Sequence, residues 1–161
     1  MRKLENKLVL ITGGASGVGL ECAKHFAQLG AHLLLIGRDK KKLGRTCRLL
    51  SNQFKVNVLQ LAGDVKDSKF AFVAVDYARS SLGAPVDVLI NNAGIIFRGD
   101  ASETDDQNWK EVIDTNLNGA FYFSRAVAKQ MSNGGAIVNI SSSCGSRGSA
   151  GLAAYCVSKA A

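Results

Sequence analysis

The sequence predicts an α/β fold built on a doubly wound parallel sheet. Short runs of aliphatic residues alternate along the chain with longer segments whose apolar residues recur at helical spacing. This alternation is typical of a parallel sheet that carries helices on both faces. A glycine-rich segment, residues 12–19, separates the first aliphatic run from the first helical segment, which is where such folds bind phosphate groups.

The first strand is expected at residues 8–12, because four aliphatic residues in succession suit a strand that is buried on both faces. The first helix is expected at residues 18–29 and should end at Gly30. Its apolar face is expected to consist of Val18, Cys22, Phe26 and Leu29.

The central part of the chain repeats the alternation of strand and helix. Further strands are expected at residues 32–36, 56–61 and 86–90, and further helices at residues 40–53 and 70–81. Pro85 is the only proline and opens the fourth strand, a position in which a strand tolerates proline.

One long helix is expected to follow, because residues 104–107 (Thr-Asp-Asp-Gln) resemble a capping box. Its inward positions at helical spacing are expected to be Trp109, Val112, Ile113, Asn116, Leu117, Ala120 and Phe121. Two glycines then precede a fifth apolar strand at residues 136–140, and a last helix is expected to begin near Ala153.

Composition excludes several other classes of protein. The chain has 161 residues, of which 47% are hydrophobic and 20% charged, as expected for a single domain over residues 1–161. The net charge is +7, but the basic residues are dispersed, so no nucleic-acid partner is expected. No apolar run is long enough for a membrane span or a signal peptide, which predicts a cytoplasmic protein. The cysteines and histidines lack metal-ligand spacing, so no metal is expected.

The glycine segment predicts a Rossmann fold that binds a dinucleotide. Gly13 permits the tight turn, Gly17 lets the backbone approach a pyrophosphate, and Gly19 lets the helix pack close to the sheet. The first helix offers unpaired N–H groups to the phosphates. A purely structural turn is the alternative interpretation, and the strand before it and the helix after it make that alternative less favourable.

The end of the second strand indicates which cofactor is bound. A protein that binds NAD typically has a carboxylate there, to pair with the ribose hydroxyls. This chain has Gly37 and Arg38 instead, and a guanidinium suits a 2′-phosphate. NADP is therefore expected, with NAD as the alternative because Asp39 follows.

Taken together, these motifs and those farther along the chain resemble the short-chain dehydrogenase/reductase family, over the whole length of the sequence. The matching positions are Thr12, Gly13, Gly17, Gly19, Asp64-Val65, Asn91-Asn92-Ala93-Gly94, Asn116, Ser142, Tyr155 and Lys159. The resemblance implies hydride transfer between a nicotinamide cofactor and a carbonyl compound or secondary alcohol. It also implies homo-oligomers among full-length members.

The spacing of Tyr155 and Lys159 supports this resemblance. The two residues are four apart on the expected last helix and so share one face. A tyrosine is a poor base at neutral pH, but a neighbouring ammonium stabilises a phenolate. Tyr155 is the expected acid and base. An ordinary surface tyrosine and lysine would be the alternative without the other motifs.

The resemblance assigns roles to the remaining residues. Ser142, just past the fifth strand, would hydrogen-bond the substrate oxygen, and Lys159 would hold the nicotinamide ribose. Asn116 would anchor a water of the proton relay, whereas the residues alone also allow a kink or a satisfied buried amide. The cofactor would be bound by Thr12, Gly13, Ser16, Gly17, Val18, Gly19, Arg38, Asp64, Val65, Asn91, Ala93, Gly94, Tyr155 and Lys159.

The sequence departs from the family pattern at its end, Ala161, because family members continue beyond this point. A C-terminally truncated chain that lacks the usual last strands and the substrate loop is therefore expected, with marginal stability, little activity and an exposed edge at strand 136–140. The alternative function is a cofactor-binding remnant without turnover. The overall pattern is similar to 3-oxoacyl-[acyl-carrier-protein] reductases, followed by sugar or polyol dehydrogenases.

Overall fold

Five parallel strands form one sheet in the order β3-β2-β1-β4-β5. The computed structural model describes residues 3–131 and 134–161. The strands are β1 (Leu8–Thr12), β2 (His32–Gly37), β3 (Val58–Ala62), β4 (Val88–Asn91) and β5 (Ala136–Asn139). The expected doubly wound parallel sheet is confirmed, although β3 and β4 each begin two residues later than expected.

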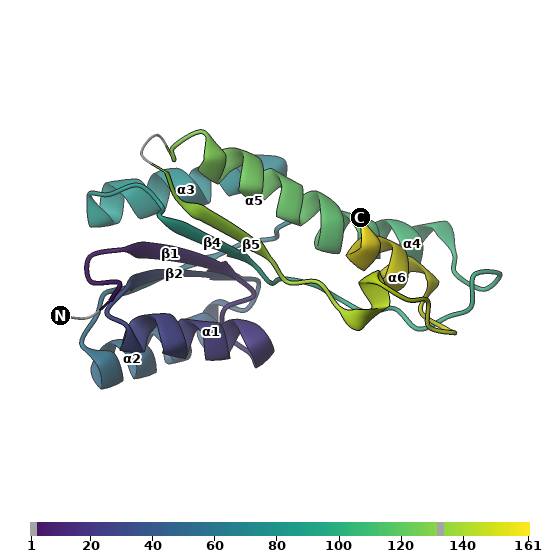
Figure 1. Ribbon diagram of the computed structural model, residues 1–161, viewed down its shortest axis with the longest axis horizontal. Helices are drawn as coiled ribbons and strands as arrows, with labels where there is room; N and C mark the ends of the chain where they lie inside the picture. The colour runs from purple at the N-terminus through teal and green to yellow at the C-terminus, as the bar shows by residue number, and fades with distance from the viewer. Residues whose placement is uncertain (1–2, 132–133) are drawn as a thin grey trace.

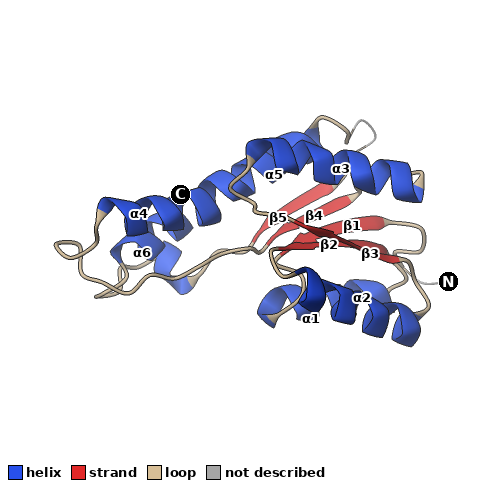
Figure 2. Cartoon of the chain, turned by 180° about the vertical axis from the view of Figure 1, so that it is seen from behind, coloured by secondary structure: helices blue, strands red, loops and turns tan. Residues whose placement is uncertain are grey.

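Helices cover both faces of this sheet. They are α1 (Gly17–Gln28), α2 (Lys40–Phe54), α3 (Ser68–Leu82), α4 (Asp106–Ile113), α5 (Gly119–Ala128) and α6 (Ala153–Ala160). Helices α1 and α2 lie against one face and α3 and α5 against the other, while α4 and α6 lie together beyond the sheet (Figures 1 and 2). This arrangement leaves the carboxyl ends of the strands facing the α4–α6 pair.

Alternating side chains of the strands fill the two layers of the core. Leu8 and Leu10 of β1 pack with Phe123 of α5 in one layer. Val9 and Ile11 of β1 pack in the other layer, where α1 contributes small side chains. All five residues of β1 are buried, which explains its continuous apolar sequence.

The predicted apolar face of α1 is confirmed only in part, because Cys22 and Phe26 are partly buried and pack against the core. The buried residues of α1 are Gly19, Ala23 and Ala27, whereas Val18 is 57% exposed. Small side chains bring the helix axis close to the sheet, so the face with the larger residues is turned partly outward.

The long helix expected after residue 104 is interrupted. Asp105 rather than Thr104 is the N-cap, and its Oδ1 accepts a hydrogen bond of 2.7 Å from the Asn108 amide. The expected capping box is therefore wrong. A π-helical turn, η1 (Asp114–Asn118), separates α4 from α5. Trp109 and Phe121 are 41% and 55% exposed, so the prediction that they point inward was also wrong.

The fifth strand lies at the edge of the sheet, paired only with β4 among the described residues. Ile137 and Val138 of β5 are 37% and 43% exposed. The expected exposed edge is present, and such an edge favours aggregation.

Candidate active site

A cleft of about 280 Å³ opens at the carboxyl ends of the strands. It contains seven of the residues predicted to bind a cofactor: Gly13, Ser16, Arg38, Asp64, Val65, Ala93 and Gly94. Topological switch points of such sheets lie at this end, where the chain crosses from one face to the other. Here the switch falls between β1 and β4.

The ends of β1 and β4 are joined by side-chain hydrogen bonds. Thr12 Oγ1 accepts hydrogen bonds of 3.0 Å from the backbone amides of Asn92 and Ala93. Asn92 Nδ2 donates to the carbonyl oxygens of Thr12 at 3.0 Å and Gly13 at 3.2 Å. The motif containing Asn92 was predicted, but this organising role was not. Thr12 itself is buried behind the cleft and shapes the loop from there.

Asn91, the first residue of the Asn91-Asn92 pair, points elsewhere. Asn91 Nδ2 donates to Ala120 O, Ser124 Oγ and Asn139 Oδ1 at 3.2, 2.9 and 2.9 Å. Its side chain is therefore directed at α5 and β5, and a direct role in cofactor binding stays a prediction for Asn91.

Glycine is required at two positions of the loop for different physical reasons. A Cβ on Gly19 would lie only 2.5 Å from Asn92 Nδ2 and would also collide with the carbonyl oxygen of Gly13. Gly17 has open space around it but a φ of +53°, which favours glycine. Gly19 therefore serves packing, whereas the open surface at Gly17 is available to a ligand.

Replacement of Gly17 by Ala is expected to weaken cofactor binding by about tenfold or more, because a methyl group would occupy the side from which a pyrophosphate approaches. Gly83→Ala is the matched control, since Gly83 also has a positive φ (+70°) and open space but lies at the end of α3. Both variants should lose roughly 1–2 kcal/mol of unfolding free energy. Fluorescence titration with NADPH measures the binding, and an equal loss of affinity in the two variants would contradict the assignment.

Arg38 and Asp39 follow β2 at the rim of the cleft, and both are exposed. Asp39 caps α2 by accepting a hydrogen bond of 2.9 Å from the Lys42 amide. This bond lowers the pKa of the Asp39 carboxyl. One carboxylate oxygen is thus occupied by the helix, while the Arg38 guanidinium lies on the lining of the cleft.

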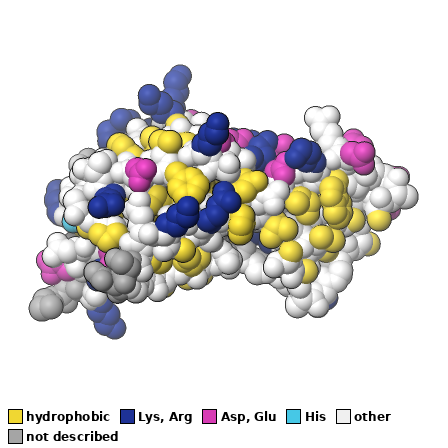
Figure 3. Space-filling model, turned by 90° about the horizontal axis from the view of Figure 1, so that it is seen from above, with side chains coloured by type: hydrophobic (Ala, Val, Ile, Leu, Met, Phe, Trp, Pro, Cys, Tyr) yellow, Lys and Arg dark blue, Asp and Glu magenta, His cyan; other side chains and the backbone are white. Residues whose placement is uncertain are grey.

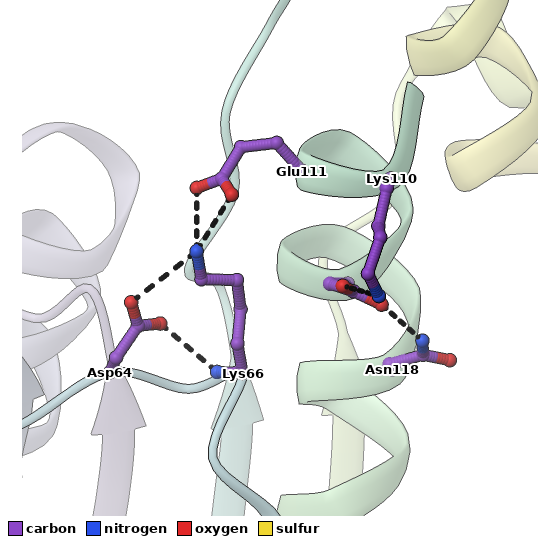
Figure 4. Close-up of polar contacts among 6 residues, drawn as sticks. Asp64, Lys66, Lys110, Glu111 and Asn118 are labelled. Atoms are coloured by element: carbon purple, nitrogen blue, oxygen red, sulfur yellow. Dashed lines mark hydrogen bonds and ion pairs between the residues drawn. The ribbon is translucent and has the colours of Figure 1, made fainter. Parts of the chain in front are cut away.

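An ion-pair network ties the loop after β3 to α4 (Figure 4). Lys66 Nζ lies 2.7 Å from both carboxylate oxygens of Glu111 and 3.7 Å from Asp64 Oδ2. The Lys66 amide also donates to Asp64 Oδ1 at 3.0 Å. The hydrogen bond to Glu111 raises the pKa of Lys66. Asp64 is thereby fixed beside the cleft by two groups of Lys66.

Asn116 connects the loop after β4, the π-helical turn and α6. Its Oδ1 accepts from the Ile95 amide at 2.8 Å, and its Nδ2 donates to Ile95 O and Ser158 Oγ, both at 2.9 Å. The side chain is buried and lies in the π-helical turn, a feature that is frequent at functional sites. Asn116 is thus a satisfied buried amide, and the water-anchoring role stays a prediction.

Tyr155 and Lys159 lie on one face of α6, as expected, with Lys159 Nζ 5.9 Å from the centre of the Tyr155 ring. The Lys159 ammonium donates a hydrogen bond of 2.7 Å to Ile140 O, at the end of β5. Burial lowers the pKa of Lys159. A Cβ on Gly94 would lie 3.7 Å from Lys159 Nζ, so the ammonium also reaches the edge of the cleft that Gly94 lines.

Ser142 lies in the turn that packs against α6. Its Oγ accepts a hydrogen bond of 3.2 Å from the Cys144 amide, which starts the short 3₁₀ helix η2 (Ser143–Gly145). The neighbouring Ser141 Oγ donates to Lys159 O at 2.9 Å. The turn and the helix therefore form one unit that carries the predicted serine, tyrosine and lysine.

On the face shown in Figure 3, Lys and Arg side chains are scattered among hydrophobic ones. Within residues 3–131 and 134–161, no helix is long and apolar enough to cross a membrane. The same residues contain no group of three or more His, Cys, Asp or Glu that could bind a metal.

The family model for short chain dehydrogenases matches residues 7–161. A galactitol 2-dehydrogenase (L-tagatose-forming) from Cereibacter sphaeroides is 37% identical over 145 residues, which are 89% of this chain and 55% of that protein. A 3-oxoacyl-[acyl-carrier-protein] reductase from Chlamydia muridarum is 35% identical over 159 residues, 98% of this chain and 64% of the relative.

A solved structure agrees with these relatives. The crystal structure of NAD⁺-bound xylitol dehydrogenase matches with a TM-score of 0.93 and 28% identity, and the match covers 98% of this chain and 61% of that one. The chain thus spans less than two thirds of the length of these three proteins. With its sheet, glycine loop and α6 residues in the predicted places, the chain belongs to the short-chain dehydrogenase family.

Proposed function

We propose that the chain provides the cofactor-binding and acid–base machinery of an NADP-dependent oxidoreductase that acts on a small carbonyl compound or secondary alcohol. The observation that carries the proposal is the position of Lys159 Nζ, which shares a face of α6 with Tyr155 and approaches Gly94. Gly94 lines the cleft together with part of the glycine loop. The relatives named above are dehydrogenases and a reductase, which supports the reaction class.

The residues of the cleft fit a dinucleotide. The open surface over Gly17 and the start of α1 suit a pyrophosphate, and Asp64 and Val65 line the part proposed for the adenine. The remaining proposed cofactor residues are Thr12, Gly13, Ser16, Val18, Gly19, Asn91, Ala93 and Gly94. A bound nicotinamide cofactor would supply hydride transfer.

Residues of the chain would transfer the proton and hydrogen-bond the substrate oxygen. The Tyr155 hydroxyl would donate a proton to a carbonyl oxygen, or its phenolate would accept one from an alcohol. The Lys159 ammonium has donors left after its bond to Ile140 O, for the nicotinamide ribose. Ser142 would hydrogen-bond the substrate oxygen as negative charge develops on it. Asn116 would anchor a water of the proton relay beside α6.

Tight binding of NADPH relative to NADH is expected, because the Arg38 guanidinium lies on the cleft where a 2′-phosphate would be bound. Charge-assisted hydrogen bonds to phosphate contribute about 1.5–3 kcal/mol, so Arg38→Ala should reduce NADPH affinity by roughly 10- to 100-fold and leave NADH affinity nearly unchanged.

The measurement is the ratio of the two dissociation constants. Arg45→Ala is the control, since Arg45 is an exposed arginine on α2 that does not line the cleft. Equal affinities for NADPH and NADH in the unaltered chain would overturn the choice of NADP and leave NAD as the cofactor.

A titration with NADPH beside an assay of carbonyl reduction tests the proposal as a whole. Binding together with turnover supports the oxidoreductase. Binding without turnover would instead identify a chain that only binds the cofactor. Failure of both would overturn the proposal.

A further inference from the structure

Two cysteines flank the proposed catalytic residues on segments that pack together. Cys144 lies in η2, two residues after Ser142. Cys156 lies in α6, directly after Tyr155. Both are free thiols of intermediate exposure, and η2 and α6 are in contact. Neither thiol has a part in the function proposed above.

Both thiols contact the same residue, Ser149. Cys144 Sγ lies 3.6 Å from Ser149 Oγ, and Cys156 Sγ donates to Ser149 O at 4.0 Å. Cys156 is also among the groups that lower the pKa of the Cys144 thiol. The shared contact with Ser149 places the two thiols on neighbouring parts of the packed η2–α6 unit.

The surroundings of Cys144 favour its thiolate. Hydrogen bonds from Ser149, Ser142 and Cys156, with the charge of Arg147, lower the pKa of the Cys144 thiol. The thiolate is the form that reacts with peroxides. Cys47 is the opposite case, because burial raises the pKa of its thiol to about 11.

We propose that Cys144 and Cys156 form a reversible disulfide when the protein meets a hydroperoxide. The Cys144 thiolate attacks one peroxide oxygen, the O–O bond breaks, and a sulfenic acid forms on Cys144 with release of one water or alcohol. The Cys156 thiol then attacks this sulfur, the S–O bond breaks, and water leaves. Two electrons pass from the thiols to the peroxide, and exchange with a dithiol restores both thiols.

The disulfide would fix the Ser142 turn to the Tyr155 helix. The S–S bond, about 2.05 Å long, would replace the contacts that now run through Ser149. The disulfide would close residues 144–156 into a ring. Tyr155 would lie inside this ring, and Ser142 would lie two residues before it. We therefore expect oxidation to lower turnover and reduction to restore it, and this expectation rests on the proposed function.

Peptide mapping tests the disulfide independently of activity. The full chain is treated with hydrogen peroxide, its free thiols are blocked with N-ethylmaleimide, and trypsin is added without reductant. Cleavage after Arg147 places the two cysteines in separate peptides, 130–147 and 148–159, each with a single cysteine. The expected product is this pair joined with the loss of two hydrogen atoms and separated by dithiothreitol.

Two variants complete the test. Cys156→Ser should abolish the linked pair and leave a Cys144 sulfenic acid that dimedone traps. Cys22→Ser should leave the pair unchanged, because Cys22 lies on α1. Linkage to Cys22 or Cys47 instead, or no linkage, would overturn the proposal. A Cys144–Cys156 disulfide with unchanged turnover would overturn only the statement that the disulfide controls activity. Absence of turnover in both the reduced and the oxidised form would count against the proposed function.

Discussion

Replacement of Tyr155 by Phe is expected to lower the rate of carbonyl reduction by roughly 10²–10⁴-fold, the usual contribution of a positioned acid or base. The substitution removes only the hydroxyl and keeps the ring, which lies beside Lys159 on α6. Cofactor affinity should fall far less than the rate, because the glycine loop and the lining of the cleft remain intact and only the cofactor contact expected of the Tyr155 hydroxyl is lost.

The loss of NADPH absorbance with a saturating small ketone measures this rate, and fluorescence titration measures binding. Tyr77→Phe is the control, since Tyr77 is a half-buried tyrosine on α3, against the sheet. Wild-type turnover in Tyr155→Phe would remove Tyr155 from the mechanism. A loss of NADPH affinity as large as the loss of rate would mean that the hydroxyl acts mainly through cofactor binding.

A second large effect is expected from Phe123→Ala, which should reduce the free energy of unfolding by about 3–5 kcal/mol. Phe123 is fully buried between the sheet and α3, and its ring packs edge-on against Phe70 at 6.2 Å between centroids. Domains of this size are stable by about 5–15 kcal/mol, so this variant should be largely unfolded in mild denaturant.

Urea unfolding followed by circular dichroism provides the measurement. Phe121→Ala is the matched control on the same helix, because the Phe121 side chain is 55% exposed and contacts Arg125 and Tyr122. The control should change stability by roughly 0.5–1 kcal/mol. Similar losses in the two variants would show that α5 does not pack on the sheet as described.

The sheet could be predicted because its signals are local. Each aliphatic run is bounded by glycine or polar residues, and the observed strands begin and end within two residues of the predicted ones. The packed face of α1 could not be predicted in this way. Hydrophobicity favours the face with Val18 and Phe26, whereas close packing selects small residues such as Ala23.

The candidate site was predictable where a motif carries its own chemistry. The glycine loop and the pairing of Tyr155 with Lys159 belong to this class. The direction of Asn91 and Asn92 was missed, although successive side chains of a strand point to opposite sides and could have indicated it. The contact between Lys66 and Glu111 joins residues that are 45 positions apart in the sequence, and no local sequence pattern predicts such a pair.

The bonds between Thr12 and the Asn92 segment have a consequence for folding kinetics. These partners are 80 residues apart in the chain, so the glycine loop acquires its shape only after β1 and β4 have paired. Long-range parallel pairing is slow, and the site is therefore completed late. A ligand that binds only this finished loop stabilises the native state by mass action, and it should retard unfolding while leaving the folding rate unchanged.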